Sequence, residues 1–356
     1  MKISEEESGG YRNNPLRIQG LRDEIQKLQA KEECMWKQRS RNRWLKEGDQ
    51  NTSYFHCRAN QRNQRNLITR LEDDNGTWIE DETGMGKVVE GYFEQIFTSS
   101  NPSGFDHILS GIQSIGEVDL IEQLEGDFQA CEVKEALNQM APLTTPGPDG
   151  MSPIFYKSFW HIVGEDVSAV ALRALNSGIV PNFINTTFIT LIPKIKNSRK
   201  VSDFRPISLC NVFYKPIAKV VANRLKKFLA NTVPNSQSAF LSGRLISDNI
   251  LVAFETLQFL KRKTQGKMAY MAFKLDMSKA YDRVEWEFLE VLMQHLGLGE
   301  KMRKIIMSCV RSVSYSILLN GQPVGSIKPS RGLRQGDPLS PYLFLLCAMG
   351  LQGLVQ

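Results

Sequence analysis

The stretch that most constrains the fold of this chain is MAYMAFKLDMSKAYDRV, at residues 268–284. Apolar side chains recur there at every second position, which predicts a buried strand that ends at Asp276. A helical pattern follows at once, so Asp276 is expected on a strand-to-helix turn, where an enzyme can expose a metal ligand. An aspartate at such a turn is more often a helix cap, so this stretch alone leaves both interpretations open.

Composition places the chain among ordinary globular proteins with room for two or three domains, since 42% of its 356 residues are hydrophobic and 23% are charged. The net charge of +6 is compatible with a nucleic-acid partner. Six cysteines without a CxxC pair indicate neither a disulfide framework nor a zinc site. Without a long apolar run or a signal peptide, we expect a soluble intracellular chain with no membrane partner, and the nucleus and the cytoplasm remain open.

The N-terminal part is polar and then strongly basic. Residues 1–15 are expected to be disordered, and a helical pattern runs from residue 18 to about residue 33. Residues 35–70 contain nine basic and two acidic side chains with interleaved aromatics. Such a segment can bind nucleic acid, and Arg39, Arg41 and Arg43 are candidate contacts to a template or primer. The plainer alternative is a solvated surface with aromatic side chains in the core.

The rest of the chain mixes short strands with helices. Hairpins are predicted at residues 67–79 and 315–327, strands at 188–193 and 204–209, and helices at 88–97, 133–140, 154–163, 167–175, 212–230, 249–261, 281–296 and 300–313. A polar, Pro- and Gly-bearing segment at 98–104 indicates a soft boundary. We therefore divide the chain into a disordered N-terminus at 1–15, a basic linker region at 16–104 and a main domain at 105–356.

Five motifs, in order, resemble the reverse transcriptases of plant LINE-type (non-LTR) retrotransposons. They are TTPGPDGMSPIFYKSFW at 144–160, FITLIPKIKNSRKVSDFRPISLCN at 188–211, QSAFLSGRLISDNI at 237–250, KLDMSKAYDRVEW at 274–286 and RGLRQGDPLSPYLFLL at 331–346. The basic segment also resembles the region that links endonuclease and polymerase in such elements. The resemblance implies an α/β (α+β) polymerase right-hand fold with fingers and an incomplete palm, preceded by a helical basic N-terminal extension.

The resemblance implies template-directed DNA synthesis with two Mg²⁺ ions, deoxynucleoside triphosphates, an RNA template and a DNA primer. Asp276 matches the first catalytic aspartate and metal ligand, and the carbonyl of Met277 is a further candidate ligand. Tyr281 matches the aromatic position that excludes a sugar 2′-hydroxyl, and it also suits a core aromatic. Asp282 matches a family position as well, where we favour a structural role.

Cationic residues of the hairpin at 188–209 are the implied triphosphate site. Lys194 and Arg205 match the residues that hold the triphosphate. Lys196 is an alternative to Lys194, because the loop between the two strands is too long to decide which lysine stands at the family position. Gln335 and Gly336 match the loop beneath the nascent base pair, where glycine permits a close backbone approach.

Three arginines have two interpretations each: Arg244, Arg331 and Arg334 either follow the template or primer backbone or cap the structure. The stiff loop at 146–150 matches the family's extension of the fingers, which implies contact with template RNA. Its alternative role is that of a connector.

Three departures from the family pattern limit the expected activity. Thr144 stands where relatives usually have a basic residue, and Met349 stands where an acidic residue is common. No aromatic-any-Asp-Asp motif follows the last matched motif, and the single Asp-Asp pair, Asp73 and Asp74, lies far upstream. We therefore expect a truncated chain that is inactive alone. The alternatives are a non-catalytic nucleic-acid-binding remnant and a decayed reading frame.

Overall fold

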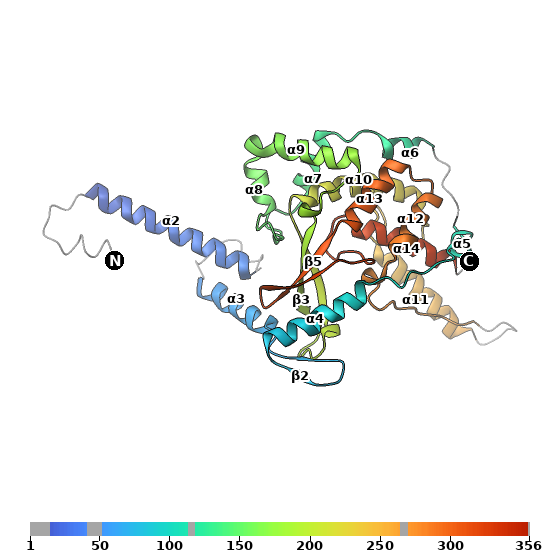
Figure 1. Cartoon of the computed structure of the whole chain (residues 1–356), viewed down its shortest axis with the longest axis horizontal. Helices are drawn as coiled ribbons and strands as arrows, with labels where there is room; N and C mark the ends of the chain where they lie inside the picture. The colour runs from blue at the N-terminus through green and yellow to red at the C-terminus, as the bar shows by residue number, and fades with distance from the viewer. Residues whose placement is uncertain (1–14, 41–51, 113–117, 264–269, 355–356) are drawn as a thin grey trace. The chain divides into compact units, whose positions relative to one another are not determined.

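The computed structural model describes residues 15–40, 52–112, 118–263 and 270–354, and the chain divides into two compact units, residues 1–68 and 69–356. The first unit contains two helices, α2 (Pro15–Ser40) and α3 (Thr52–Asn66) (Figure 1). They pack on each other, and the rings of Trp36 and His56 lie 3.7 Å apart. The helix predicted from residue 18 is confirmed and extends to Ser40.

The second unit is built on a four-stranded sheet of order β4-β3-β5-β6. Its strands are β3 (Thr186–Pro193), β4 (Phe204–Cys210), β5 (Ser314–Leu319) and β6 (Gln322–Ile327). β3 is antiparallel to β4 and parallel to β5, and alternate residues of β3 are buried, as a strand with one covered face requires. The predicted strand pair and the hairpin with its Asn320-Gly321 turn are confirmed, and both turn residues have positive φ.

Helices pack against this sheet and against one another. The most buried is α10 (Tyr214–Thr232), which packs against α7 (Ala130–Gln139), α9 (Trp160–Ser177), α13 (Glu300–Arg311) and α14 (Ser340–Gly353). Helix α4 (Glu82–Phe97) packs on the β5-β6 hairpin (Figure 1). Residues 69–104, which we grouped with the linker, therefore belong to the same compact unit as the sheet. The mixed α/β class is confirmed.

The remaining elements complete the second unit. They are β1 (Leu71–Glu72), β2 (Trp78–Ile79), α5 (Asp106–Leu109), α6 (Val118–Glu125), α8 (Pro153–Ser158), α11 (Ile246–Arg262), α12 (Trp286–His295) and the 3₁₀ turns η1 (Asn182–Ile184), η2 (Val201–Asp203) and η3 (Tyr281–Arg283). Among the described helices, none is long and apolar enough to cross a membrane.

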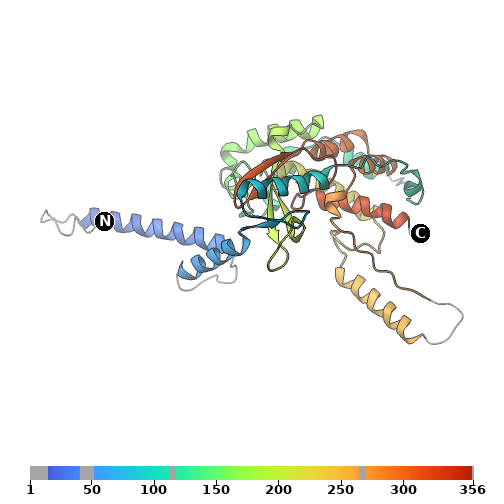
Figure 2. The same ribbon diagram turned by 60° about the horizontal axis from the view of Figure 1, so that its bottom comes forward.

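The prediction of a strand that ends at Asp276 is wrong for residues 270–276. Residues 268 and 269 of the predicted strand lie outside the described part of the chain. Residues 270–277 have no regular secondary structure and are exposed, and Phe273 keeps 77% of its surface accessible. A strand needs a neighbour to take up its backbone hydrogen bonds, and no described strand pairs with this segment. Figure 2 shows it running beside α11, away from the packed core.

The helix predicted at 281–296 is interrupted. It starts as η3, becomes extended at Val284 and Glu285, and resumes as α12. The interruption has a tertiary cause, because Glu285 forms a β-bridge with Arg331 and the Val284 carbonyl accepts a hydrogen bond from the Gly332 backbone.

Candidate active site

Three matched motifs meet at the C-terminal loop 331–338. The Gly332 backbone N–H donates to Val284 O at 2.7 Å, and the Leu333 N–H donates to Tyr281 O at 2.8 Å. On its other side the loop accepts, through Gln335 O, a 2.8 Å hydrogen bond from the Ser208 N–H of β4. The segment after Asp276, the β3-β4 hairpin and this loop therefore form one hydrogen-bonded assembly.

Two glycines make this close approach possible. Gly332 has φ of +97°, and a Cβ atom there would lie 2.8 Å from the carbonyl oxygen of Asp282. Gly336 has φ of +114°, and its Cβ would lie 3.0 Å from Ser208 O. Both the left-handed backbone and the short distances exclude a larger side chain without movement. The close approach of Gly336 is thus made to β4, while contact of Gln335 and Gly336 with a base pair stays a prediction.

Tyr281 lies half-buried with its ring stacked on that of Phe344 in α14, at 4.7 Å between centroids and 15° between planes. Burial raises the pKa of its phenol, so the hydroxyl is neutral at physiological pH. The contact fits the core role that we considered for this residue. A second role at the nucleotide sugar stays a prediction, since a half-buried ring still presents an edge to solvent.

Asp276 and Met277 are both exposed. An exposed carboxylate is a suitable oxygen ligand for Mg²⁺, which prefers six oxygen ligands in an octahedron. Within the described ranges, however, no three acidic, histidine or cysteine side chains come close enough to hold a metal ion. One carboxylate and one carbonyl are ligands of the type that Mg²⁺ prefers, but they are fewer than the six ligands that it needs. The described residues therefore do not make a complete metal site.

Lys194 and Arg205 lie at the loop end of the β3-β4 hairpin, Lys194 directly after β3 and Arg205 near the start of β4. Lys194 donates through Nζ to Ser202 O at 2.9 Å and remains exposed. Arg205 is exposed and is paired in register with Ile192. Burial, followed by the positive charges of Lys279 and Arg205, lowers the pKa of Lys194. The hairpin therefore gathers cations, and Lys196 lies exposed in the same loop.

Sequence reasoning missed Lys279 and gave Asp282 only a structural role. Asp282 is 2% exposed, its Oδ2 has no hydrogen-bond partner in the described part of the chain, and burial raises its pKa to about 6 against the opposing charges of Lys279, Lys194 and Arg283. The Nζ atom of Lys279 is likewise buried without a hydrogen-bond partner there. No periodicity marks these side chains as buried, because they lie in a turn.

All three candidate arginines bind internal acceptors. Arg331 donates to Ile96 O at 2.7 Å and pairs with Glu285 at 3.2 Å. Arg244 donates to carbonyls at and after the C-terminal end of α10, including Val233 O at 2.9 Å and Pro234 O at 2.6 Å. These contacts correspond to the capping role that the sequence left open.

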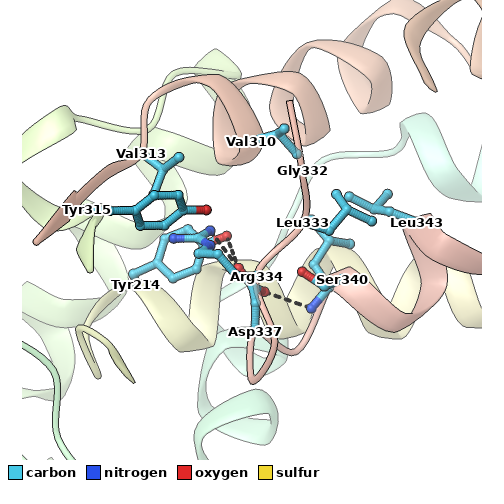
Figure 3. A pocket seen from close by; sticks show the side chains of 11 residues that line it. Tyr214, Val310, Val313, Tyr315, Gly332, Leu333, Arg334, Asp337, Ser340 and Leu343 are labelled. Atoms are coloured by element: carbon cyan, nitrogen blue, oxygen red, sulfur yellow. Dashed lines mark hydrogen bonds and ion pairs between the residues drawn. The ribbon is translucent and has the colours of Figure 1, made fainter. Parts of the chain in front are cut away.

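Arg334 is the most deeply buried of the three. It forms an ion pair with Asp337 at 2.5 Å, bonds to Asn185, and lies 4.2 Å from the centroid of the Tyr214 ring, whose hydroxyl donates to Asp337 at 2.8 Å (Figure 3). The cavity around this network is about 10 Å³, room for one water at most. The network joins β3, α10 and loop 331–338. The space there is too small for a nucleotide.

The loop at 146–150 is anchored to the start of α10. Asp149 accepts from the Val212 N–H at 2.9 Å, and its own N–H donates to the Asn211 side chain at 3.0 Å. A Cβ at Gly147 would lie 2.5 Å from Asn211 N. The loop is therefore a well-held connector, and its contact with template RNA stays a prediction.

In the first unit, Arg39 is exposed and lies 5.3 Å from the centroid of the Trp36 ring. Arg41 and Arg43 lie outside the described residues.

Comparison with known proteins agrees with this arrangement. Residues 192–355 match the sequence model of the reverse transcriptase (RNA-dependent DNA polymerase) family. This part of the chain is a reverse transcriptase domain. The match includes the β3-β4 hairpin from residue 192 onward, the segment after Asp276 and the loop 331–338, which are the three parts that meet in space.

The relatives of this reverse transcriptase domain include proteins of non-LTR retrotransposons. An uncharacterized 149 kDa protein of transposon TX1 from Xenopus laevis is 29% identical over 86% of this chain. Pol polyproteins of the R2 element of Nasonia vitripennis and the R2DM element of Drosophila melanogaster are each 28% identical, over 60% and 76% of the chain. The chain covers 23%, 20% and 24% of these three proteins.

Proposed function

We propose that this chain is part of the RNA-directed DNA polymerase of a LINE-type retrotransposon of a plant. Its substrates are deoxynucleoside triphosphates, copied from an RNA template onto a DNA primer. The observation that carries the proposal is the hydrogen-bonded meeting of the segment after Asp276, the β3-β4 hairpin and loop 331–338. On the hairpin, Lys194 lies near Lys279 and Asp282, which follow Asp276 in the chain.

In this proposal each residue has one task. Asp276 supplies a carboxylate at the reacting phosphate, and Lys194 and Arg205 offset the negative charge that develops on the leaving pyrophosphate. Tyr281 borders the nucleotide sugar, and Gln335 and Gly336 lie beneath the nascent base pair. Mg²⁺, when bound, supplies further charge stabilisation.

We further propose that these 356 residues do not catalyse DNA synthesis by themselves. Asp276 is one of three carboxylates that the family uses, and no aromatic-any-Asp-Asp segment occurs after residue 338 in this sequence. A single carboxylate does not hold two divalent cations tightly.

Two assays test these statements separately. Cross-linking of a photoreactive deoxynucleoside triphosphate should occur in the second unit and should fall when Lys194 and Arg205 are both replaced by Gln; unchanged labelling would contradict the nucleotide site. Primer extension with Mg²⁺ should show no synthesis. Synthesis that Asp276→Ala abolishes would instead prove the chain active, refuting the inactivity and supporting the family assignment.

A second candidate function is RNA binding without chemistry. Helix α3 presents Arg58, Arg62 and Arg65 to solvent, at spacings that place them near one another on the helix. Cations on such a surface bind phosphate and release counterions, so affinity for RNA should fall steeply with salt. Replacing all three arginines by Gln should reduce the slope of log affinity against log salt by about 2 to 3. An unchanged slope would remove α3 from the binding surface.

A further inference from the structure

Lys279 has an unusual environment for a lysine. It follows Asp276 by three residues, in a turn where its φ is +56°, a left-handed conformation that few non-glycine residues adopt. Its Nζ atom is buried, has no hydrogen-bond acceptor in the described ranges, and lies 5.6 Å from the centroid of the Tyr92 ring. A buried ammonium group without an acceptor is costly, so the fold holds this charge in place at a loss of stability.

The charged groups around Lys279 include further cations and one carboxylate, Asp282, whose negative charge favours the charged form of Lys194. Lys279 and Arg205 are both near enough to Lys194 to disfavour its positive charge. By contrast, other buried cations of the second unit have acceptors: Lys215 donates to Thr145 O, and Arg334 pairs with Asp337. Asp282 is the one carboxylate coupled to Lys194, against the two cations Lys279 and Arg205, and Lys279 Nζ still lacks a hydrogen-bond acceptor, so the cluster has room for a further anion.

We propose that Lys279 is a polyphosphate-binding residue that forms one site with Lys194 and Arg205. This inference rests on the proposed function, in which Lys194 and Arg205 hold the triphosphate. The three cations come from three places in the sequence, namely the end of β3, the start of β4 and the turn before η3. Phosphate oxygens accept charge-assisted hydrogen bonds from ammonium and guanidinium groups, so a polyphosphate supplies the acceptor that Lys279 lacks.

Access to Lys279 requires a small rearrangement. Its Nζ is buried, whereas Lys194 is exposed and donates to the carbonyl of Ser202. In the proposed site a phosphate oxygen replaces that carbonyl as the acceptor for Lys194, and Lys279 Nζ must become accessible to the same anion.

Asp282 opposes the incoming anion. Its buried carboxylate faces Lys279, Lys194 and Arg283, and the phenol of Tyr92 lies on the α4 side. A negative charge in this position repels a polyphosphate, so Asp282→Asn should bind polyphosphate about threefold or more tightly at pH 8. The gain should shrink as pH falls below about 6, where the wild-type carboxyl is also neutral.

The test is calorimetric titration of the 356-residue chain with sodium tripolyphosphate at low salt. Lys279→Asn removes the charge, and Asn tolerates the left-handed backbone, so the variant is expected to fold. Its dissociation constant should rise about tenfold, the effect of losing one hydrogen bond from a charged donor. Lys279→Arg should stay within about threefold of wild type, because the positive charge remains.

The matched control is Lys261→Gln, which removes one positive charge from the exposed end of α11 and should change the dissociation constant by less than about twofold. Thermal melting followed by circular dichroism shows whether each variant is folded.

Two results would overturn the proposal in distinguishable ways. Wild-type affinity in folded Lys279→Asn, together with weaker binding in Lys194→Gln, would keep the nucleotide site and make Lys279 structural. Absence of tripolyphosphate binding by the wild-type chain would remove the proposed nucleotide site as well. If Lys279→Asn does not fold, Asp282→Asn decides, because unchanged affinity in that variant contradicts a polyphosphate beside Lys279.

Discussion

At the scale of single residues, the carboxyl group of Asp282 gives the clearest prediction for how stability depends on pH. Its pKa is raised by burial to about 6, above the ordinary 3.8, so the folded chain binds a proton that the unfolded chain has released between these values. Stability from this group is therefore lost as pH rises from about 4 to about 6. A pKa difference of one between the folded and unfolded chain corresponds to about 1.4 kcal/mol, so the loss is about 3 kcal/mol. Asp282→Asn should not show this loss, because its side chain does not titrate. The unfolding free energy of the variant minus that of wild type should therefore rise by about 2 to 3 kcal/mol between pH 4 and pH 7.5 in urea titrations. A difference that stays constant with pH would show that the carboxyl titrates normally.

At the scale of elements, loop 331–338 holds two distant segments together through its glycines. In Gly332→Ala the new methyl group would meet the carbonyl of Asp282 at 2.8 Å, and the backbone has φ of +97°. Gly321 is a matched control, since its φ of +90° is similar but nothing lies within 4 Å of its Cβ position. We expect Gly321→Ala to cost about 1 kcal/mol from backbone strain alone and Gly332→Ala about 2 kcal/mol more, measured by urea unfolding. Equal costs would mean that the loop and η3 separate easily.

At the scale of the whole molecule, an apolar surface is exposed on α11 and on residues 270–277. No described residue of α11 is buried, and Ile250, Phe254 and Phe273 are each more than half exposed. Contiguous apolar surface of this kind promotes association. The isolated chain should therefore self-associate at micromolar concentration in light scattering, and Phe254→Lys with Phe273→Lys should reduce association without lowering the melting temperature. The matched control, Ile162→Lys on α9, also replaces an exposed apolar side chain and should leave association unchanged. A monomeric wild-type chain would contradict this prediction.

Local patterns in the sequence determined most elements. Local patterns located β3 and β4, the helices α10 and α13, and, through the Asn-Gly pair, the β5-β6 turn. The motifs also directed attention to Asp276 and to the cationic hairpin, because residue type and order are properties of the chain alone.

Tertiary structure decided the rest, because burial and pairing depend on neighbours from elsewhere in the chain. Residues 270–276 have the alternation of a strand but pair with none of the described strands, since alternation does not supply a partner. Arg334 belongs to a motif and is buried in an ion pair, and Lys279 is polar and has a buried ammonium group. The sequence named the residues of the candidate site. Only the fold decided which of their charges are already paired and which remain available for a ligand.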